Sequence, residues 1–430
     1  MAMQDITHYM RAGTLSLTSL PPLSLYIHLP WCLKKCPYCD FNSHEVSNRT
    51  SLIKVHSSLQ SASSSPNLNP DLSSTTPTQH LHLPIALEQQ YIAALIADLQ
   101  SALPLIWGRP VQSIFIGGGT PSLFSPESIE SLLSQIRSLL PLVAECEITL
   151  EANPGTFEKD RFRAFKNAGV TRLSVGVQSF NDAHLQALGR VHSAEQAHLA
   201  LQEAAATFKT YNLDLMYALP QQTIEQLEAD LQTALSFEPP HLSIYQLTLE
   251  PNTVFAKYPP VVPDEDTAYS MLDLIEERTA SHELKRYEIS AFSRKGHQCW
   301  HNVNYWQFGD YLGIGAGAHG KISFAHRIIR QNKTRDPLLY IEKALAGNAI
   351  AQESEIKRAD LPFEFMLNGL RLIEGVSVGQ FLERTGLPIS SIQKGLAQGI
   401  QKGLLIDDLH QIKATPHGIN FLNDLQQLFL

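Results

Sequence analysis

Three cysteines near the N-terminus have a spacing that suits metal binding: Cys32, Cys36 and Cys39 form the pattern C-x3-C-x2-C. Thiolates are the protein ligands of iron–sulfur clusters, and a [4Fe–4S] cluster bound only by protein uses four of them. Three thiolates would hold three corners of such a cluster and leave the fourth iron without a protein ligand. An iron with an open position can bind and activate a small molecule.

A structural zinc site is the alternative for these cysteines. Zinc sites usually show two pairs of ligands, with a C-x2-C spacing or a close variant repeated further along the chain. Here the two other cysteines, Cys146 and Cys299, are isolated. Zinc stays open at this point, because side chains close to the motif could complete a tetrahedron; they are His28, Asp40 and His44.

A glycine-rich segment follows the apolar run SIFI, with Gly117, Gly118 and Gly119 leading into Thr120 and Pro121. Glycines at the end of a strand let a ligand approach the backbone closely. A phosphate-binding loop would continue with Lys and Ser or Thr at the start of a helix, and that continuation is absent. The segment therefore predicts a binding loop that is not one for a nucleoside triphosphate, or else a tight structural turn.

Short β-type runs alternate with helical patterns over the first 250 residues. The predicted strands are Ser24–Leu29, Val111–Ile116, Glu147–Glu151, Arg172–Val177, Tyr211–Met216 and His241–Thr248. The predicted helices lie near 87–103, 126–139, 157–167, 193–208 and 222–236. This alternation predicts a parallel sheet with right-handed crossovers, either doubly wound or barrel-like. Its site lies at the carboxyl ends of the strands, where the cysteine loop, the glycine loop, Glu151, Gln178 and Asp214 all fall.

Composition and charge exclude several classes of protein. The apolar content is 43%, the charged content 17% and the net charge −9, which is typical of a soluble globular chain and argues against a broad nucleic-acid or anionic-lipid surface. We expect no transmembrane segment and no secretory signal. Clustered cysteines fit a reducing compartment, so we expect a cytoplasmic protein.

Two regions depart from the alternation. Residues 45–84 are rich in Ser, Pro, Asn and Thr, a composition that cannot bury enough apolar surface to fold, so we expect a disordered insertion, with a lid over the site as the alternative. After about residue 255 the alternation fades. We expect an N-terminal tail over 1–21, a core over 22–255, a connecting segment over 256–350 and a C-terminal domain over 351–430, mostly helical with a hairpin around LLIDDLHQIKATP.

The motifs together resemble the radical S-adenosylmethionine (SAM) enzymes, and within them the HemN-like family. The resemblance rests on YIHLPWCLKKCPYCDFNSH, IGGGTPS, TLEANPGT, LSVGVQSF with LGRVHS, NLDLMYALP, YQLTLEPNT and WHNVNYW, in that order from about residue 22 to the end. It implies a partial (β/α)6 TIM-like barrel with a small, mostly helical, winged-helix-like C-terminal domain. It also implies one [4Fe–4S] cluster held by the three cysteines, and SAM bound at its open iron.

The resemblance implies roles for further residues. Tyr26 and Tyr38 would lie beside the cofactor, and Gly118, Gly119 and Thr120 would contact its methionine part. Glu151 would accept a hydrogen bond from a ribose hydroxyl or the amino group. Gln178 and Asp214 would complete the polar surroundings, and Arg190 would bind a carboxylate. An ordinary solvated or paired charge is the alternative for Glu151, Arg190 and Asp214.

One departure separates two branches of the family. In coproporphyrinogen dehydrogenases the motif continues to a fourth cysteine, and here that position is Phe41, in CDFNSH. This form resembles the heme-chaperone branch, which implies heme binding and delivery to respiratory or membrane heme proteins, with an electron donor for the cluster. The rivals are an oxygen-independent coproporphyrinogen III oxidase, which Phe41 disfavours, and a zinc-stabilised binding module without enzymatic activity. No coiled-coil or interface pattern supports a homodimer, although the chain is compatible with one.

Heme needs an axial ligand and an apolar, aromatic surface. His301, in WHNVNYWQF, is flanked by Trp300, Tyr305 and Trp306, and is the candidate heme ligand. A histidine that pins its loop against the core is the equal alternative. His319 and Cys299 are weaker candidates.

Overall fold

The computed structural model describes residues 6, 7, 9–46, 83–156 and 160–430. Twelve of the described strands form one sheet, in the order β14-β13-β12-β11-β1-β4-β5-β6-β7-β8-β10-β9. Its centre is six parallel strands: β1 (Leu23–Leu29), β4 (Val111–Gly118), β5 (Leu142–Ala152), β6 (Arg172–Gln178), β7 (Thr210–Tyr217) and β8 (His241–Gln246). They match the six strands predicted from the sequence within a few residues, and confirm the partial (β/α)6 barrel. We call these strands and their helices the partial barrel.

Helices connect successive parallel strands. They are α1 (Ile85–Ile106), α2 (Pro126–Leu139), α3 (Arg161–Asn167), α4 (Asp182–Ala187), α5 (Ala194–Thr207) and α6 (Ile224–Ser236), followed by α7 (Val254–Lys257) and α8 (Glu265–Ser281). Ser193 and Gln196 form a capping box at the start of α5, and Thr223 with Gln226 does so at α6. Such caps satisfy the first free N–H groups of a helix, which is why these helices begin where the sequence predicts.

Alternation along the strands separates the core from the site. On β7, Leu213 and Leu215 are fully buried in the core, while Asn212, Asp214 and Met216 line a cavity inside the partial barrel. Successive strand side chains point to opposite faces, so a polar residue at every second position places a row of polar groups inside the barrel. This pattern recurs on β6 and β8.

Segment 256–350 is more than the connection predicted from the sequence. It supplies strands to both edges of the sheet: β9 (Lys285–Glu288) and β10 (Ala291–Ser293) beside β8, and β11 (Asp310–Ile314), β12 (His319–Phe324) and β13 (Arg327–Lys333) beside β1. β14 (Ile350–Glu355) completes that side, and α9 (Trp300–Trp306) and α10 (Pro337–Leu345) lie between strands in the chain. Most of these strands are short, and those that join the central sheet, β10 and β11, pair with more distant segments of the chain, which leaves little periodic signal in the sequence.

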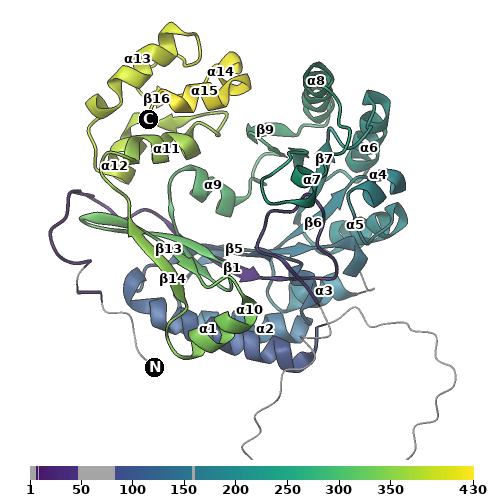
Figure 1. Ribbon diagram of the computed structural model, residues 1–430, viewed down its shortest axis with the longest axis horizontal. Coiled ribbons are helices and arrows are strands. Elements are labelled where there is room, and N and C mark those ends of the chain that lie inside the picture. Colours follow the sequence, from purple (N-terminus) through teal and green to yellow (C-terminus); the bar gives the residue numbers. More distant parts are fainter. Residues whose placement is uncertain (1–5, 8, 47–82, 157–159) are drawn as a thin grey trace, which may run out of the picture.

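Residues 356–430 form a second unit, the C-terminal lobe, with a hydrophobic core of its own. Its elements are α11 (Leu361–Gly369), β15 (Val376–Ser377), α12 (Val378–Thr385), α13 (Gln393–Gln401), β16 (Gln411–Ile412), α14 (Pro416–Asn420) and α15 (Leu422–Gln427). The predicted hairpin is present as one bridge between Leu405 and Ala414, while β16 pairs with β15. Figure 1 shows α9 between this lobe and the sheet, with α1, α2 and α10 on the opposite side of the sheet.

The N-terminal segment differs from the predicted tail. The Tyr9 ring stacks on Phe324 with centroids 4.8 Å apart, and Leu15 and Leu17 are buried in the core of the C-terminal lobe. The segment thus contacts both the sheet and the lobe. The predicted insertion over 45–84 lies almost wholly outside the described residues, as do positions 157–159 of the predicted third helix.

Candidate functional site

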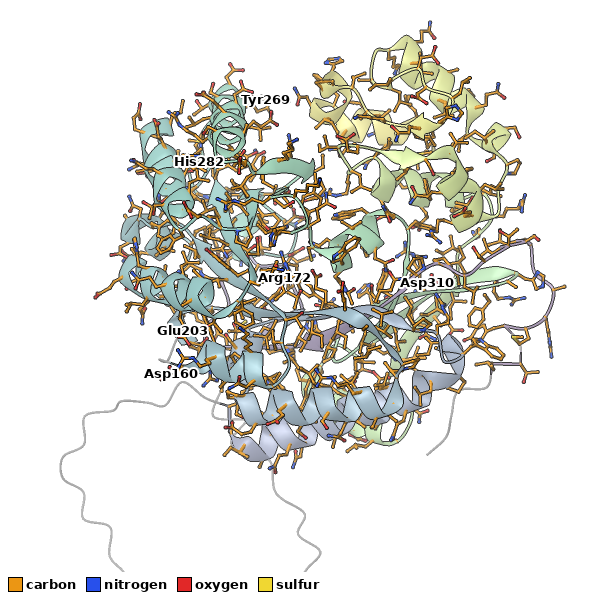
Figure 2. All side chains as sticks on the ribbon, turned by 180° about the vertical axis from the view of Figure 1, so that it is seen from behind. Asp160, Arg172, Glu203, Tyr269, His282 and Asp310 are labelled. Carbon is orange, nitrogen blue, oxygen red and sulfur yellow. The ribbon has the colours of Figure 1, made fainter. Side chains whose placement is uncertain are left out.

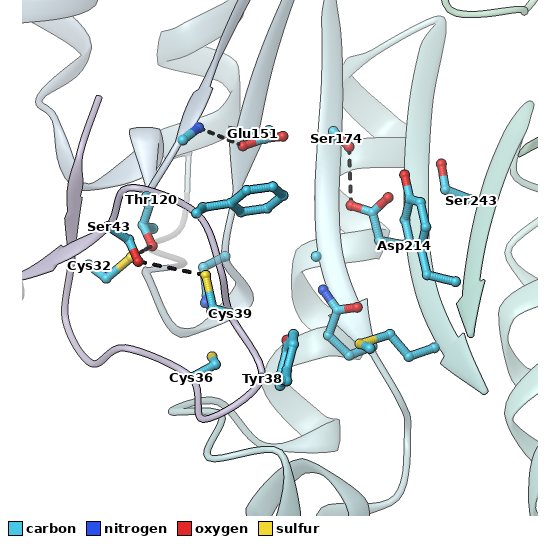
Figure 3. A pocket seen from close by; sticks show the side chains of 18 of the residues that line it. Cys32, Cys36, Tyr38, Cys39, Ser43, Thr120, Glu151, Ser174, Asp214 and Ser243 are labelled. Atoms are coloured by element: carbon cyan, nitrogen blue, oxygen red, sulfur yellow. Dashed lines mark hydrogen bonds between the residues drawn. The ribbon is translucent and has the colours of Figure 1, made fainter. Parts of the chain in front are cut away.

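The cysteine loop follows β1 and returns on itself. The short strands β2 (Trp31–Cys32) and β3 (His44–Glu45) pair in parallel, which closes the loop at its base. All three thiols line a cavity of about 400 Å³ inside the partial barrel. Each sulfur has a polar neighbour from a different segment, drawn in part in Figure 3: Thr120 Oγ1 at 3.5 Å from Cys32, Arg190 Nη1 at 3.8 Å from Cys36 and Ser43 Oγ at 3.6 Å from Cys39.

The zinc alternative would need a fourth ligand from the side chains near the motif. One of these candidates, His28, is committed elsewhere through both ring nitrogens. Burial raises the pKa of Cys32 to about 11, so bound iron is what would keep this thiol ionised.

The glycine loop packs directly on the cysteine loop. Gly119 N–H donates to Leu29 O at 2.8 Å, and Thr120 N–H to Trp31 O at 2.8 Å. A Cβ on Gly119 would lie 2.6 Å from that Trp31 oxygen, so a side chain does not fit there. The close packing of the two loops therefore requires glycine at this position, and the glycine loop also forms part of the cavity wall. This packing supports the structural interpretation of the motif, and its role in binding a ligand stays a prediction.

Two carboxylates line the cavity, Glu151 from β5 and Asp214 from β7, with β6 between these two strands. Glu151 accepts a hydrogen bond from Gly118 N–H at 3.1 Å, and Asp214 accepts from Ser174 and Asn212 at 3.2 and 2.7 Å. Burial and the charge of Asp214 raise the pKa of Glu151 to about 7, and burial raises the pKa of Asp214 as well. Two buried acids with raised pKa values suit a ligand that brings positive charge and hydrogen-bond donors.

Arg190 presents donors to the same cavity. Its Nη2 donates to Gly176 O at 2.7 Å, while its buried Nε has no hydrogen-bond partner. A guanidinium with a free donor beside the cysteines fits the carboxylate of an amino acid. Gln178 also lines the cavity, from a left-handed backbone position at φ 72°.

Sequence reasoning missed a hydrogen-bond chain behind Asp214. Tyr287 OH and His241 Nε2 are 2.9 Å apart, His241 Nδ1 and Asn212 Oδ1 are 2.7 Å apart, and Asn212 Nδ2 donates to Asp214. Ser243 donates to the same Asn212 oxygen at 3.0 Å. The alternation of polar residues on β7 and β8 was the signal for Asn212, His241 and Ser243. Nothing local marks Tyr287, which comes from an edge strand.

Three predicted residues occupy different kinds of position. Tyr38 lines the cavity, with its ring 6.4 Å from that of Phe255. Tyr26 is absent from the lining residues, and its hydroxyl lies 3.0 Å from His28 Nδ1. Phe41 is 63% exposed at the rim of the cavity, where the other branch of the family has a fourth cysteine.

The heme candidates lie outside the cavity wall. His301 is 9% exposed on α9, its Nδ1 lies 3.2 Å from Ser113 Oγ, and its ring is 5.0 Å from that of Phe115. Burial lowers the pKa of His301 to about 3. Cys299 is buried against Glu147, and His319 is exposed at the start of β12. Next to His301, Trp300 is 60% exposed, and Asn302 reaches the cavity.

Comparison with known proteins defines the class first. The model of the radical SAM superfamily matches residues 26–234, and that of the HemN C-terminal domain matches residues 356–421. The solved structure of coproporphyrinogen III oxidase (HemN) from Escherichia coli has the same fold, with a TM-score of 0.74 at 20% identity over 99% of this chain and 98% of that one. The chain has the fold of a radical SAM protein, and the cofactors of that superfamily are a [4Fe–4S] cluster and SAM.

The particular family follows from full-length relatives. The chain is 41% identical over 416 residues to heme chaperone HemW of Escherichia coli (strain K12), covering 96% of this chain and 100% of that protein. It is 43% identical over 420 residues to heme chaperone HemW of Haemophilus influenzae, covering 96% and 99%. The chain therefore belongs to the HemW family. A mouse relative, the mitochondrial radical S-adenosyl methionine domain-containing protein 1, is 33% identical over 419 residues, covering 94% and 86%.

The residues of the cavity fit both cofactors. The three cysteines would hold the cluster, and the Arg190 guanidinium and the glycine loop would face the amino-acid part of SAM. Glu151 and Asp214 would face its hydroxyl or amino donors. When bound, the cluster and SAM supply one-electron chemistry. The protein's own part is to hold the carboxylates, the guanidinium and the thiolates in place around them.

Affinity for SAM is expected to depend on the protonation of Glu151. Its pKa of about 7 lies above the ordinary 4.5, so below pH 7 the acid is mostly neutral in the free protein. The hydrogen-bond donors and positive charge of SAM favour the ionised carboxylate, so binding releases a proton. The affinity then rises by up to about tenfold per pH unit below pH 7 and levels off above it. Calorimetry at pH 6, 7 and 8 in two buffers measures both the affinity for SAM and the release of the proton. Glu151→Gln should abolish the pH dependence of SAM affinity that this carboxyl group causes. An unchanged slope of affinity against pH in that variant would contradict the prediction.

Proposed function

We propose that this protein is a heme chaperone: it binds heme, carries a [4Fe–4S] cluster with SAM, and delivers heme to acceptor proteins. The near-full-length identity of 41–43% to two proteins named heme chaperone HemW carries the proposal. The exposed Phe41 at the rim of the cavity supports it, because the decarboxylating branch has a cysteine there. We place the protein in the cytoplasm, with respiratory or membrane heme proteins as acceptors and a separate electron donor for the cluster. Among the described residues, no helix is long and apolar enough to cross a bilayer.

Coproporphyrinogen oxidation is the second candidate. The fold similarity to HemN at a TM-score of 0.74 favours it, as does a cavity that continues past Asp214 to polar groups on β6 and β8. The absent fourth cysteine is the argument against it. We therefore expect no conversion of coproporphyrinogen III to protoporphyrinogen.

An anaerobic heme titration beside a coproporphyrinogen turnover assay on the same reconstituted sample tests the proposal. We expect saturable binding near one heme per chain, seen as a shifted Soret band, and no turnover. Transfer of heme from the loaded protein to an apo-cytochrome b in vesicles would test delivery. Turnover without saturable heme binding would assign the chain to the decarboxylating branch instead.

His301 is the proposed heme ligand, and because it is buried, heme can bind it only after a change in the structure. Because its Nδ1 faces Ser113 and its ring packs on Phe115, heme could reach it only after α9 moves. We expect His301→Ala to weaken heme binding at least tenfold, as removal of an axial ligand does. Ser113→Ala is the matched control, since it removes the hydrogen-bond partner and keeps the imidazole. Equal loss in both variants, or in neither, would contradict ligation by His301.

A further inference from the structure

Asn212, on β7, has every hydrogen-bonding group of its side chain engaged. Its Nδ2 donates to Asp214 Oδ1 at 2.7 Å and to Ser174 Oγ at 2.8 Å. Its Oδ1 accepts from Ser243 Oγ at 3.0 Å and lies 2.7 Å from His241 Nδ1. An amide side chain has two donor hydrogens and two acceptor lone pairs, so Asn212 has no group left for a ligand.

The donors of this network run in one direction. The amide oxygen of Asn212 can only accept, so His241 Nδ1 carries the proton between them. Burial lowers the pKa of His241 well below 6.5, so the ring is neutral and its Nε2 has a lone pair. That lone pair accepts the hydroxyl proton of Tyr287 at 2.9 Å, and the Tyr287 oxygen accepts from Cys299 N–H at 3.3 Å. Every proton from Cys299 inward thus points toward Asp214.

Both carboxylate oxygens of Asp214 are held by this network. Oδ1 accepts from Asn212, and Oδ2 accepts from Ser174 at 3.2 Å, the bond drawn in Figure 3. Because Asn212 also donates to Ser174, the three side chains close a ring that fixes the plane of the carboxylate. Each carboxylate oxygen keeps a further lone pair, and Asp214 lines the cavity. A ligand in the cavity can therefore donate to Asp214 while Asn212 and Ser174 hold it.

The outer end of the network is fixed by the C-terminal lobe. Tyr287 lies on β9, and its backbone oxygen accepts from Ile373 N–H at 3.0 Å. The next residue, Glu288, forms a β-bridge with Leu372. Tyr287 is buried, and the described residues that line the cavity do not include it. Its hydroxyl can therefore act on a ligand in the cavity only through the side chains that it contacts, of which His241 is the one that lines the cavity.

We propose that Tyr287, His241 and Asn212 are positioning residues, which hold Asp214 as a hydrogen-bond acceptor for SAM. The proposal rests on SAM binding, which belongs to the proposed function, and is independent of heme delivery. Its physical basis is that outer partners which orient a binding group change affinity at the site although they touch no ligand. Hydrogen bonds in a chain also strengthen one another, so the loss of an outer bond weakens the hold on Asp214.

A double-mutant cycle with Asp214 tests the proposal, with the dissociation constant for SAM measured by calorimetry on the reconstituted full chain. His241→Phe keeps a ring in place without its hydrogen bonds, and we expect SAM binding to weaken about 10- to 100-fold. Tyr287→Phe removes one oxygen atom and should weaken binding about 2- to 10-fold, the effect of one hydrogen bond. In the Asp214→Asn background, neither substitution should weaken SAM binding further.

Tyr211→Phe is the matched control. Tyr211 lies on the same strand as Asp214, is also buried, and its hydroxyl donates to Phe237 O at 2.8 Å. This variant loses a buried hydrogen bond outside the network, so it should unfold at a lower urea concentration, as Tyr287→Phe should. Its affinity for SAM should stay at the wild-type value. Iron content reports whether the cluster is intact in each variant.

Several results would overturn the proposal. If the losses from His241→Phe and Asp214→Asn multiply, His241 acts on SAM by another route. If Tyr287→Phe with full iron content binds SAM like wild type, or no more weakly than Tyr211→Phe, the network positions nothing. A wild-type chain that binds no SAM would overturn the assignment of the cofactor, and this proposal with it.

Two substitutes keep the test decisive. Should His241→Phe not fold, Tyr287→Phe takes its place in the cycle, because it keeps the ring and removes a single oxygen atom. Should Asp214→Asn bind SAM too weakly to measure, His241→Phe supplies the background instead. Tyr287→Phe should add nothing there, and a further loss of affinity would overturn the proposal.

Discussion

Cys36→Ala is expected to reduce the iron content from about four per chain to below one and to abolish the broad absorbance near 400 nm. In this variant only two protein thiolates remain, so one more iron of the cluster loses its protein ligand. The variant also lacks the thiolate that lies 3.8 Å from the Arg190 guanidinium. SAM binding should be lost with the cluster, since the open iron disappears. Iron and sulfide analysis after anaerobic reconstitution, with circular dichroism to follow the fold, measures both effects.

Cys146→Ala is the matched control for this prediction. Cys146 is a buried cysteine on β5 that does not line the cavity, so the variant should keep its full iron content. We expect the far-ultraviolet spectrum of both variants to resemble wild type, because the loop is held at its base by backbone pairing. Unchanged iron in Cys36→Ala would contradict the assignment of the cluster.

Asp310→Asn is expected to lower the free energy of unfolding by about 3–5 kcal/mol, the cost of leaving a buried charge without its partner. Asp310 is fully buried on β11, where its carboxylate binds Lys321 at 3.0 Å, Arg109 at 2.9 Å and Ser323 at 2.7 Å. Lys321 is itself buried, and its Nζ lies 4.2 Å from the ring centroid of Phe308, in the core of the C-terminal lobe. Figure 2 shows Asp310 beneath this lobe.

Urea unfolding, with the midpoint and the slope fitted separately, measures this effect. Glu374→Gln is the control, because its side chain is 83% exposed and its pair with Lys413 is of the same 2.8–3.0 Å length. Exposed pairs contribute about 0–1 kcal/mol, so the control should unfold close to wild type. Equal effects in the two variants would show that burial of the Asp310 network contributes nothing to stability.

Local patterns were enough to predict the alternating framework and the place of the site. The parallel strands and their helices carry periodic apolar positions and capping residues such as Ser193 and Thr223, which act within a few residues of the chain. The cysteine spacing is equally local. For that reason the six central strands and the convergence of Glu151, Gln178 and Asp214 at their carboxyl ends could be predicted without coordinates.

Tertiary structure alone decided which polar group each of these side chains faces. Strand pairing between residues far apart in the chain places Asn42 on Ala316 and Tyr287 on His241, and no periodic signal marks such contacts. It also turns Tyr26 toward His28 and buries His301 against β4. The sequence by itself determined that a three-cysteine loop, a glycine loop and paired acids meet in a partial barrel. Packing determined how they are held, because a hydrogen bond depends on the position of both partners and the sequence specifies only their chemistry.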